Sequence, residues 1–229
     1  MEYTCAQVAK MIDHSLLNPA MSADDLEAGC RLALDYDVAS VCILPYYVTR
    51  CAEILSGSSV KVGTTVGFPH GGQAREVKLA EAIRALEDGA EEVDMVVNVS
   101  AVLSGRWDYV AEEIAGIANA VHEAGMKVKV IFENCYLDNE LKTRLCGICG
   151  DVPADWVKTS TGYGSGGATL DDVKLMRANS PPCVQIKAAG GIRDLDTLLA
   201  FRALGVTRIG ASRTRDILDD CATRLGPIG

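Results

Sequence analysis

The chain has 229 residues, of which 48% are hydrophobic, and a formal net charge of −9 at pH 7. This length fits one large domain or two small ones, and the apolar fraction is ample for a sizeable core. An acidic exterior argues against nucleic acid and anionic membranes as partners, although a local site can still be positive. No apolar run reaches the ~18 residues of a membrane span, and the first residues lack the pattern of a secretory signal. Nine cysteines without regular spacing favour a reducing, cytoplasmic compartment.

Short apolar or β-branched runs recur along the chain, and each is a predicted strand. The eight runs are 12–17, 38–44, 61–68, 92–98, 128–134, 156–161, 183–188 and 208–212.

Helical patterns lie between most of these runs. Segments 75–89 and 108–125 carry apolar residues at offsets of three and four, and each ends at a glycine, as helices commonly do. The S/T-x-x-D sequences that begin at Ser22 and Thr169 are typical of helix N-termini.

Strands that alternate with helices predict a parallel sheet with helices outside it. Eight such units predict an α/β fold with a single domain over residues 1–229, namely a closed (β/α)8 TIM barrel. A doubly wound open sheet, which usually has fewer strands, is the alternative. No linker or low-complexity tract divides the chain.

Charged residues lie inside predicted strands that should be apolar if they are buried on both faces. They are Asp13, Asp94, Lys158 and Lys187. Alternate side chains of every barrel strand point into the same interior, so residues far apart in sequence can meet there. A lone buried charge becomes neutral or destabilises the fold, whereas opposite charges persist by pairing. The alternative for each lysine is a strand end whose ammonium reaches solvent.

Two buried lysines and a carboxylate suit amine catalysis. A lysine attacks a carbonyl only when it is unprotonated, and its ordinary pKa is about 10.4. Burial and a neighbouring ammonium both lower that pKa. The amine can then form a Schiff base, an electron sink for C–C cleavage, while the carboxylate transfers protons. Spacing leaves the choice of nucleophile open. Lys129 is a third candidate, although the doublet Lys127-x-Lys129 looks like a solvated strand entrance.

Glycine-rich turns follow the last three predicted strands. In this architecture the loops after strands seven and eight commonly bind phosphate through backbone N–H groups at a helix start. The alternative is that these turns are tight and need glycine for their geometry. The candidate contacts are Thr161, Gly162, Gly190, Gly191, Gly210, Ser212 and Arg213.

Neither a metal site nor a redox centre is indicated, so no metal and no cofactor are expected. His14, His70 and His122 show none of the usual metal-ligand spacings. Cys146 and Cys149 form a C-x-x-C at the end of a predicted helix. Outside a thioredoxin-like context, two thiols on one helix are the better interpretation.

Stretches running in order from Ile12 to Ser212 resemble the deoxyribose-phosphate aldolases, which are metal-independent Schiff-base aldolases. They are IDHSLL, SVCILP, TTVGFPHG, EVDMVVN, KVIFENCYL, VKTSTGYGSGGAT, IKAAGGIRD and RIGAS. VKTSTG followed by KAAGGIR is a specific combination. The resemblance implies a cytoplasmic lyase without cofactor that reversibly cleaves 2-deoxy-D-ribose 5-phosphate to D-glyceraldehyde 3-phosphate and acetaldehyde, in deoxyribonucleoside catabolism. Homodimers are common in such barrels, and a homodimer is a further expectation.

The resemblance also implies roles for individual residues. Lys158 would be the Schiff-base nucleophile, and Lys187 would lower its pKa and take part in proton relay. Asp94 would be the acid/base carboxylate, with Asp13 in support. Other positions match residues that line the pocket or bind substrate and phosphate. They are Ser15, Cys42, Thr161, Gly162, Gly190, Gly191, Gly210 and Ser212.

Two positions depart from the family pattern. Tyr163 stands where many relatives have Phe or Lys, and Arg213 stands where many have a small residue. A Schiff-base aldolase of the same fold that acts on another phosphorylated aldehyde or ketone stays an alternative, because its reactive residues would be unchanged. A silent sugar-phosphate-binding barrel is a second alternative, against which the joint presence of Asp94, Lys158 and Lys187 argues.

Overall fold

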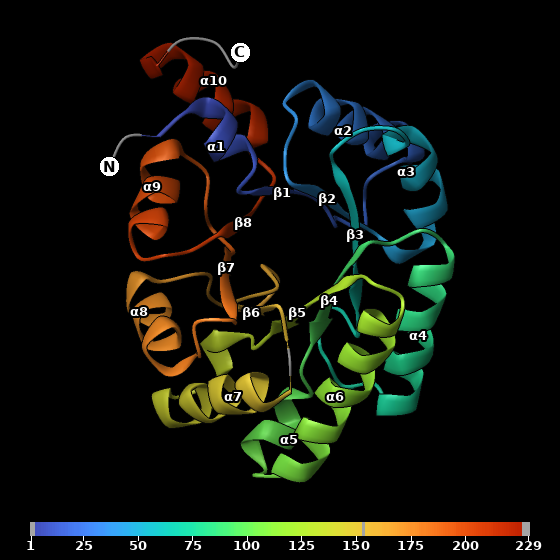
Figure 1. Ribbon diagram of the computed structural model, residues 1–229, viewed down its shortest axis with the longest axis vertical. Helices are drawn as coiled ribbons and strands as arrows, with labels where there is room; N and C mark the ends of the chain where they lie inside the picture. Colours follow the sequence, from blue (N-terminus) through green and yellow to red (C-terminus); the bar gives the residue numbers. More distant parts are fainter. Residues whose placement is uncertain (1–2, 153, 226–229) are drawn as a thin grey trace.

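The computed structural model describes residues 3–152 and 154–225, which form a closed barrel of parallel strands with helices outside (Figure 1). Neighbouring strands pair in chain order, and the last strand pairs with the first. The strands are β1 (Ile12–Leu16), β2 (Ser40–Ile43), β3 (Lys61–Val66), β4 (Glu92–Val96), β5 (Lys127–Ile131), β6 (Trp156–Lys158), β7 (Gln185–Ala189) and β8 (Arg208–Ala211). The predicted TIM barrel is therefore confirmed, and the doubly wound sheet is wrong.

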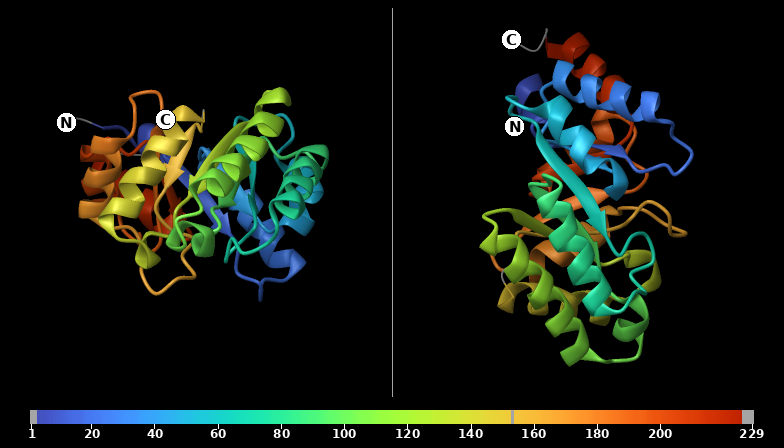
Figure 2. Two further views of the ribbon diagram at one scale, coloured as in Figure 1. Left: turned by 90° about the horizontal axis from the view of Figure 1, so that it is seen from below. Right: turned by 90° about the vertical axis from the view of Figure 1, so that its right-hand side faces the viewer.

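The helices cover the outer face of the barrel. They are α1 (Cys5–Ala9), α2 (Ala23–Asp35), α3 (Val48–Leu55), α4 (Arg75–Glu87), α5 (Val99–Leu103), α6 (Trp107–Glu123), α7 (Asn139–Asp151), α8 (Leu170–Asn179), α9 (Leu195–Ala203) and α10 (Thr214–Leu225). Two 3-10 turns, η1 (Pro45–Tyr47) and η2 (Asn134–Tyr136), follow β2 and β5. Figures 1 and 2 show α1 and α10 side by side, so the first and last helices of the chain pack against each other. Within the described residues, no helix combines the length and apolarity needed to span a bilayer.

The helix signals read from the sequence are confirmed. The Ser22 and Thr169 hydroxyls accept hydrogen bonds from the backbone N–H groups three residues later, as N-caps do. Gly89 and Gly125 follow α4 and α6 with φ of +104° and +75°. A residue with a side chain would be strained there, so glycine ends each helix cleanly.

Strand register determines which side chains share the interior. Asp94 lies opposite Lys129 across β4 and β5. Lys158 lies opposite Lys187 across β6 and β7, and Lys187 lies opposite Arg208 across β7 and β8. Directly paired residues of neighbouring strands point to the same face. These charged side chains therefore all project into the barrel.

Candidate active site

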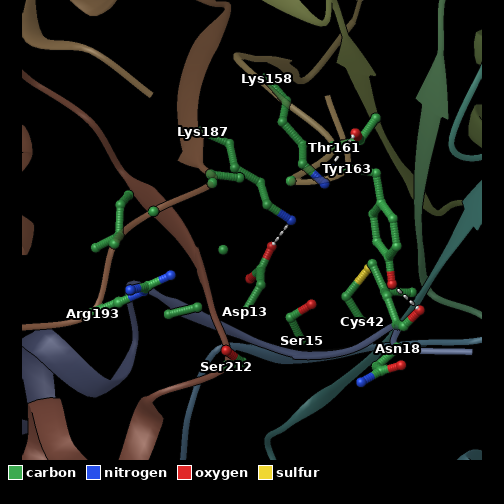
Figure 3. A pocket seen from close by; sticks show the side chains of 18 residues that line it. Asp13, Ser15, Asn18, Cys42, Lys158, Thr161, Tyr163, Lys187, Arg193 and Ser212 are labelled. Carbon is green, nitrogen blue, oxygen red and sulfur yellow. Dashed lines mark hydrogen bonds and ion pairs between the residues drawn. The ribbon is translucent and has the colours of Figure 1, made fainter. Parts of the chain in front are cut away.

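A cavity of about 420 Å³ opens at the carboxyl ends of β1, β2 and β6–β8. This is the end of a parallel barrel at which active sites are built. Figure 3 shows Lys158 and Lys187 pointing into the cavity, with Asp13 facing Lys187. The predicted residues that line it are Asp13, Ser15, Cys42, Lys158, Thr161, Gly162, Lys187, Gly190, Gly191, Gly210 and Ser212.

Asp94 lies directly beneath the two lysines and is fully buried. Its Oδ2 accepts hydrogen bonds from Lys158 Nζ at 2.6 Å and from Lys187 Nζ at 2.7 Å. Its Oδ1 accepts a hydrogen bond from Lys129 Nζ at 2.9 Å. Lys187 Nζ also pairs with Asp13 Oδ2 at 2.5 Å. The four residues predicted as reactive therefore form one connected cluster, and each lysine ammonium is held below the surface.

The lysines of this cluster differ in basicity. Burial and the nearby Lys187 ammonium lower the pKa of Lys158, and Asp94 offsets only part of that effect. Burial also acts against the charge of Lys187, but Asp13 and Asp94 outweigh it and raise the pKa of Lys187. Burial disfavours ionised Asp94, yet its three lysine neighbours hold the pKa of Asp94 well below its ordinary range. Lys158 is therefore the lysine whose neutral, nucleophilic form is most accessible.

Lys129 does not belong to a solvated strand entrance, so that interpretation was wrong. Its side chain is 1% exposed and pairs with Glu92 at 2.6 Å as well as with Asp94. Lys127, its partner in the sequence doublet, is exposed and pairs with Asp155. The idea that the strand lysines reach solvent is wrong for the same reason, because Lys158 and Lys187 are 3% and 1% exposed.

Two further charged residues of the interior were missed by sequence reasoning. Arg208 Nε donates a hydrogen bond to Asp13 Oδ1 at 2.6 Å, and Arg208 Nη2 donates one to Glu92 Oε2. The Trp156 ring lies against this group, with its centroid 5.2 Å from the Arg208 guanidinium carbon and 5.7 Å from Lys129 Nζ. Period-two alternation could have found Glu92, which lies two positions before Asp94 on the same strand.

The loops after β6 and β7 line part of the cavity with glycine turns. Gly162, Gly190 and Gly191 have φ between +84° and +88°, a region that residues with side chains avoid. A Cβ on Gly190 would lie 2.9 Å from Gly167 Cα. These turns thus need glycine for their geometry, and they also bring backbone atoms close to the cavity.

Arg213 does not line the cavity in the described part of the chain. It is exposed and pairs with Asp216 at 3.2 Å, on the first turn of α10. Arg193 lines the cavity instead, and Figure 3 shows it across the cavity from Tyr163. Sequence reasoning missed Arg193 although it lies only two residues after Gly191 in IKAAGGIRD.

Tyr163 closes part of the rim. Its hydroxyl donates a hydrogen bond to the Leu17 carbonyl at 2.7 Å, and its ring packs edge-on against Phe68 at 5.5 Å between centroids. The loop after β6 is thereby tied to the loop after β1, across the mouth of the barrel.

The remaining sequence candidates lie away from the cavity. Cys146 and Cys149 are buried in α7, and burial raises the pKa of Cys146 to about 11. His70 is exposed, and His122 pairs with Asp155 on the outside of the barrel. In residues 3–152 and 154–225, no group of three or more potential ligands is arranged to hold a metal ion.

Comparison with known proteins identifies the family. The sequence model described as DeoC/LacD family aldolase matches residues 7–219. The chain belongs to this family. It is 59% identical over 225 residues to a deoxyribose-phosphate aldolase of Rhodopirellula baltica, covering 98% of this chain and 93% of that protein. It is 46% identical to that of Thermococcus gammatolerans, over 90% and 92% of the two chains.

A solved structure supports the same assignment. The tetrameric deoxyribose-phosphate aldolase of Aeropyrum pernix superimposes with a TM-score of 0.88 at 30% identity, covering 96% of this chain and 92% of that one. Membership of the DeoC/LacD family of aldolases thus agrees with the closed barrel and with the lysine cluster at its carboxyl end.

Proposed function

We propose that this DeoC/LacD family member is a Schiff-base aldolase that reversibly cleaves 2-deoxy-D-ribose 5-phosphate to D-glyceraldehyde 3-phosphate and acetaldehyde. One observation carries the proposal. A single buried carboxylate, Asp94, binds both Lys158 and Lys187 at the floor of the cavity, and the pKa of Lys158 is lowered there. An amine held partly neutral next to a proton-transferring pair is what carbonyl condensation requires.

The reaction follows from these roles. The Lys158 amine attacks the C1 aldehyde of the open-chain sugar, and loss of water gives a protonated Schiff base. Removal of the C3 hydroxyl proton sends the C2–C3 electron pair toward the iminium nitrogen. D-Glyceraldehyde 3-phosphate leaves, and an enamine stays on Lys158. Protonation at C2 and hydrolysis then release acetaldehyde and restore the amine.

The other cavity residues would move protons and hold the substrate. Lys187, paired with Asp94 and Asp13, is suited to give and recover the protons of the C3 hydroxyl and of the enamine. Arg193 is suited to the phosphate, because it lines the cavity and lies across it from Tyr163. The Gly190–Gly191 turn also lines the cavity, and its N–H groups would add contacts with the phosphate. Ser15, Cys42, Thr161, Gly162, Gly210 and Ser212 would complete the contacts with the sugar.

Chemical trapping tests this function. The protein is mixed with 2-deoxy-D-ribose 5-phosphate and sodium borohydride, and the modified peptide is identified by mass spectrometry. A reduced adduct on Lys158 is expected. An adduct on Lys187 or Lys129 would refute the role of Lys158 and keep the aldolase class, whereas a folded protein without any adduct would refute the Schiff-base mechanism.

A substrate panel separates the proposal from its nearest alternative, an aldolase for another phosphorylated aldehyde or ketone. Higher kcat/KM for 2-deoxy-D-ribose 5-phosphate than for phosphorylated keto sugars is expected. We further propose that the enzyme is cytoplasmic, that residues 1–229 act as one domain, and that it forms a homodimer. Light scattering coupled to size-exclusion chromatography measures the mass, and a monomer of 229 residues would refute the dimer.

A further inference from the structure

The interior of the barrel holds more positive than negative groups. In the described residues, the connected cluster contains four cationic side chains and three carboxylates, all at most 9% exposed. The cations are Lys129, Lys158, Lys187 and Arg208, and the carboxylates are Asp13, Glu92 and Asp94. With every group ionised, one buried positive charge would be left without a matching negative charge, which is costly in a dry interior.

Among the four cations, Lys158 has the fewest carboxylates near it. Within 4 Å in the described chain, Lys129 has three carboxylates, while Lys187 and Arg208 have two each. Lys158 has Asp94 alone, and it shares that oxygen with Lys187 at 2.6 and 2.7 Å. Lys158 is therefore the cation that loses its proton at the lowest cost.

Arg208 and Glu92 lie at the first positions of β8 and β4, at the amino-terminal end of the barrel and away from the cavity. An arginine stays protonated in proteins, so Arg208 is a permanent positive charge in this cluster. It neutralises Asp13 and Glu92 directly. Those two carboxylates are then less available to stabilise an ammonium elsewhere in the interior.

We propose that Arg208 and Glu92 set the protonation of Lys158 by fixing the charge balance of the barrel interior, with Arg208 favouring the uncharged amine and Glu92 opposing it. This inference rests on the proposed role of Lys158 as the nucleophile. Neither residue touches Lys158, and both act as positioning residues rather than catalytic ones. Uncharged side chains of β2 and β3 also lie next to the cluster. Cys42 of β2 is a neutral thiol, because burial raises its pKa to about 11, and Thr65 of β3 is uncharged.

The charge balance predicts opposite effects of two substitutions. Arg208→Gln leaves three lysines against three carboxylates, so an ionised Lys158 becomes balanced and its pKa rises. Glu92→Gln leaves four cations against two carboxylates, so the pKa of Lys158 falls further. The double variant has three cations and two carboxylates and restores the surplus of one. Removing one nearby charge typically moves such a titration by about 1–2 pH units.

The experiment measures the titration of Lys158 without any substrate. Trace acetic anhydride labels free amines across a pH series, and mass spectrometry reports the labelled fraction of the Lys158 peptide. The expected midpoint is about 1–2 units higher for Arg208→Gln, lower for Glu92→Gln, and near that of the unaltered protein for the double variant. Arg208→Lys keeps the charge and should not move it. Arg75→Gln, which removes a surface ion pair with Glu76 and Glu112, is the matched control.

Several outcomes would overturn the proposal. They are equal midpoints in all variants, the same shift for Arg208→Lys as for Arg208→Gln, and a double variant that does not return toward the unaltered value. If Arg208→Gln does not fold, Glu92→Gln and the double variant still decide, because the first must lower the midpoint and the second must restore it. The pH profile of kcat/KM should move with the labelling midpoint. A shifted labelling midpoint in a protein without aldolase activity would refute the aldolase function but not the charge balance. Normal aldolase activity with an unshifted midpoint would refute the charge balance but not the aldolase function.

Discussion

His14 gives a quantitative test of how β1 is packed against the end of the chain. It alternates with Asp13 along β1 and so faces outward, where it is 5% exposed and its Nδ1 lies 2.8 Å from Thr214 Oγ1 at the start of α10. Burial lowers the pKa of His14 from 6.5 to about 4. Between these two values the unfolded chain binds a proton that the folded protein does not. The stability that comes from holding His14 neutral is therefore fully present above pH 6.5 and is lost as the pH falls toward 4.

The size of this loss follows from the two pKa values. For one titrating group the contribution to this loss is RT ln[(1 + 10^(pKa,U − pH))/(1 + 10^(pKa,N − pH))]. The pKa of His14 is 6.5 in the unfolded chain and about 4 in the folded protein. Between pH 7.5 and pH 5 the free energy of unfolding should fall by about 2 kcal/mol because of His14 alone. Asp13 and Asp94 do not contribute in this window, since the surrounding cations outweigh the effect of burial and hold their pKa values far below it.

Urea unfolding at pH 7.5 and pH 5, followed by circular dichroism, measures the effect. His14→Gln keeps a polar group beside Thr214 but cannot titrate. The fall in the free energy of unfolding between the two pH values should be smaller by about 2 kcal/mol in this variant than in the unaltered protein. His70→Gln, which removes an exposed imidazole, controls for the substitution. An identical fall in the unaltered protein and in His14→Gln would refute the reasoning.

Further predictions concern stability, the glycine turns and the thiols. Lys78 and Glu113 form an ion pair with no exposed side-chain surface. Lys78→Met should cost about 3–5 kcal/mol in urea unfolding, because it strands the Glu113 charge, and adding Glu113→Gln should recover part of that loss. Gly190→Ala should raise KM in steady-state assays, since its Cβ would collide with backbone and its φ is +88°. The double variant Cys146→Ser, Cys149→Ser should keep kcat/KM within about twofold, because both thiols lie outside the cavity.

The barrel could be predicted because its signals are local. Capping residues such as Ser22 and glycines such as Gly89 act within one helical turn, and hydrophobic runs mark buried strands without knowledge of their neighbours. The ends of the strands were harder to predict from the sequence. The run 156–161 was predicted as one strand, but β6 ends at Lys158. Thr161 donates through its N–H to Glu133, from the turn after β5, and a contact between segments 28 residues apart leaves no pattern in either segment.

The reactive cluster was predictable in part, for a related reason. Lysine or aspartate in mid-strand contradicts the apolar pattern, so Lys158, Lys187 and Asp94 stand out. Arg208 and Glu92 begin their strands, where charged residues usually meet solvent. Glu92 shares the period-two face of Asp94, but nothing local separates Arg208 from a solvated strand start. Their burial depends on Trp156, whose ring lies 5.2 Å from the Arg208 guanidinium, and on the closure of β8 onto β1. Closure is a property of the whole chain.

The presence of a lysine inside a strand is explained by the cluster as a whole. One buried ammonium would cost several kcal/mol, but Lys158 shares Asp94 with two other lysines and can stay neutral in a set whose other charges balance. The groups that lower the pKa of Lys158 and the groups that make it tolerable in the core thus belong to one cluster. Truncating any of them to alanine would change fold stability and reactivity together and could not separate the two. Substitutions that keep the charge, such as Arg208→Lys, or that remove one charge of each sign can separate them, because they alter contacts while leaving the balance intact.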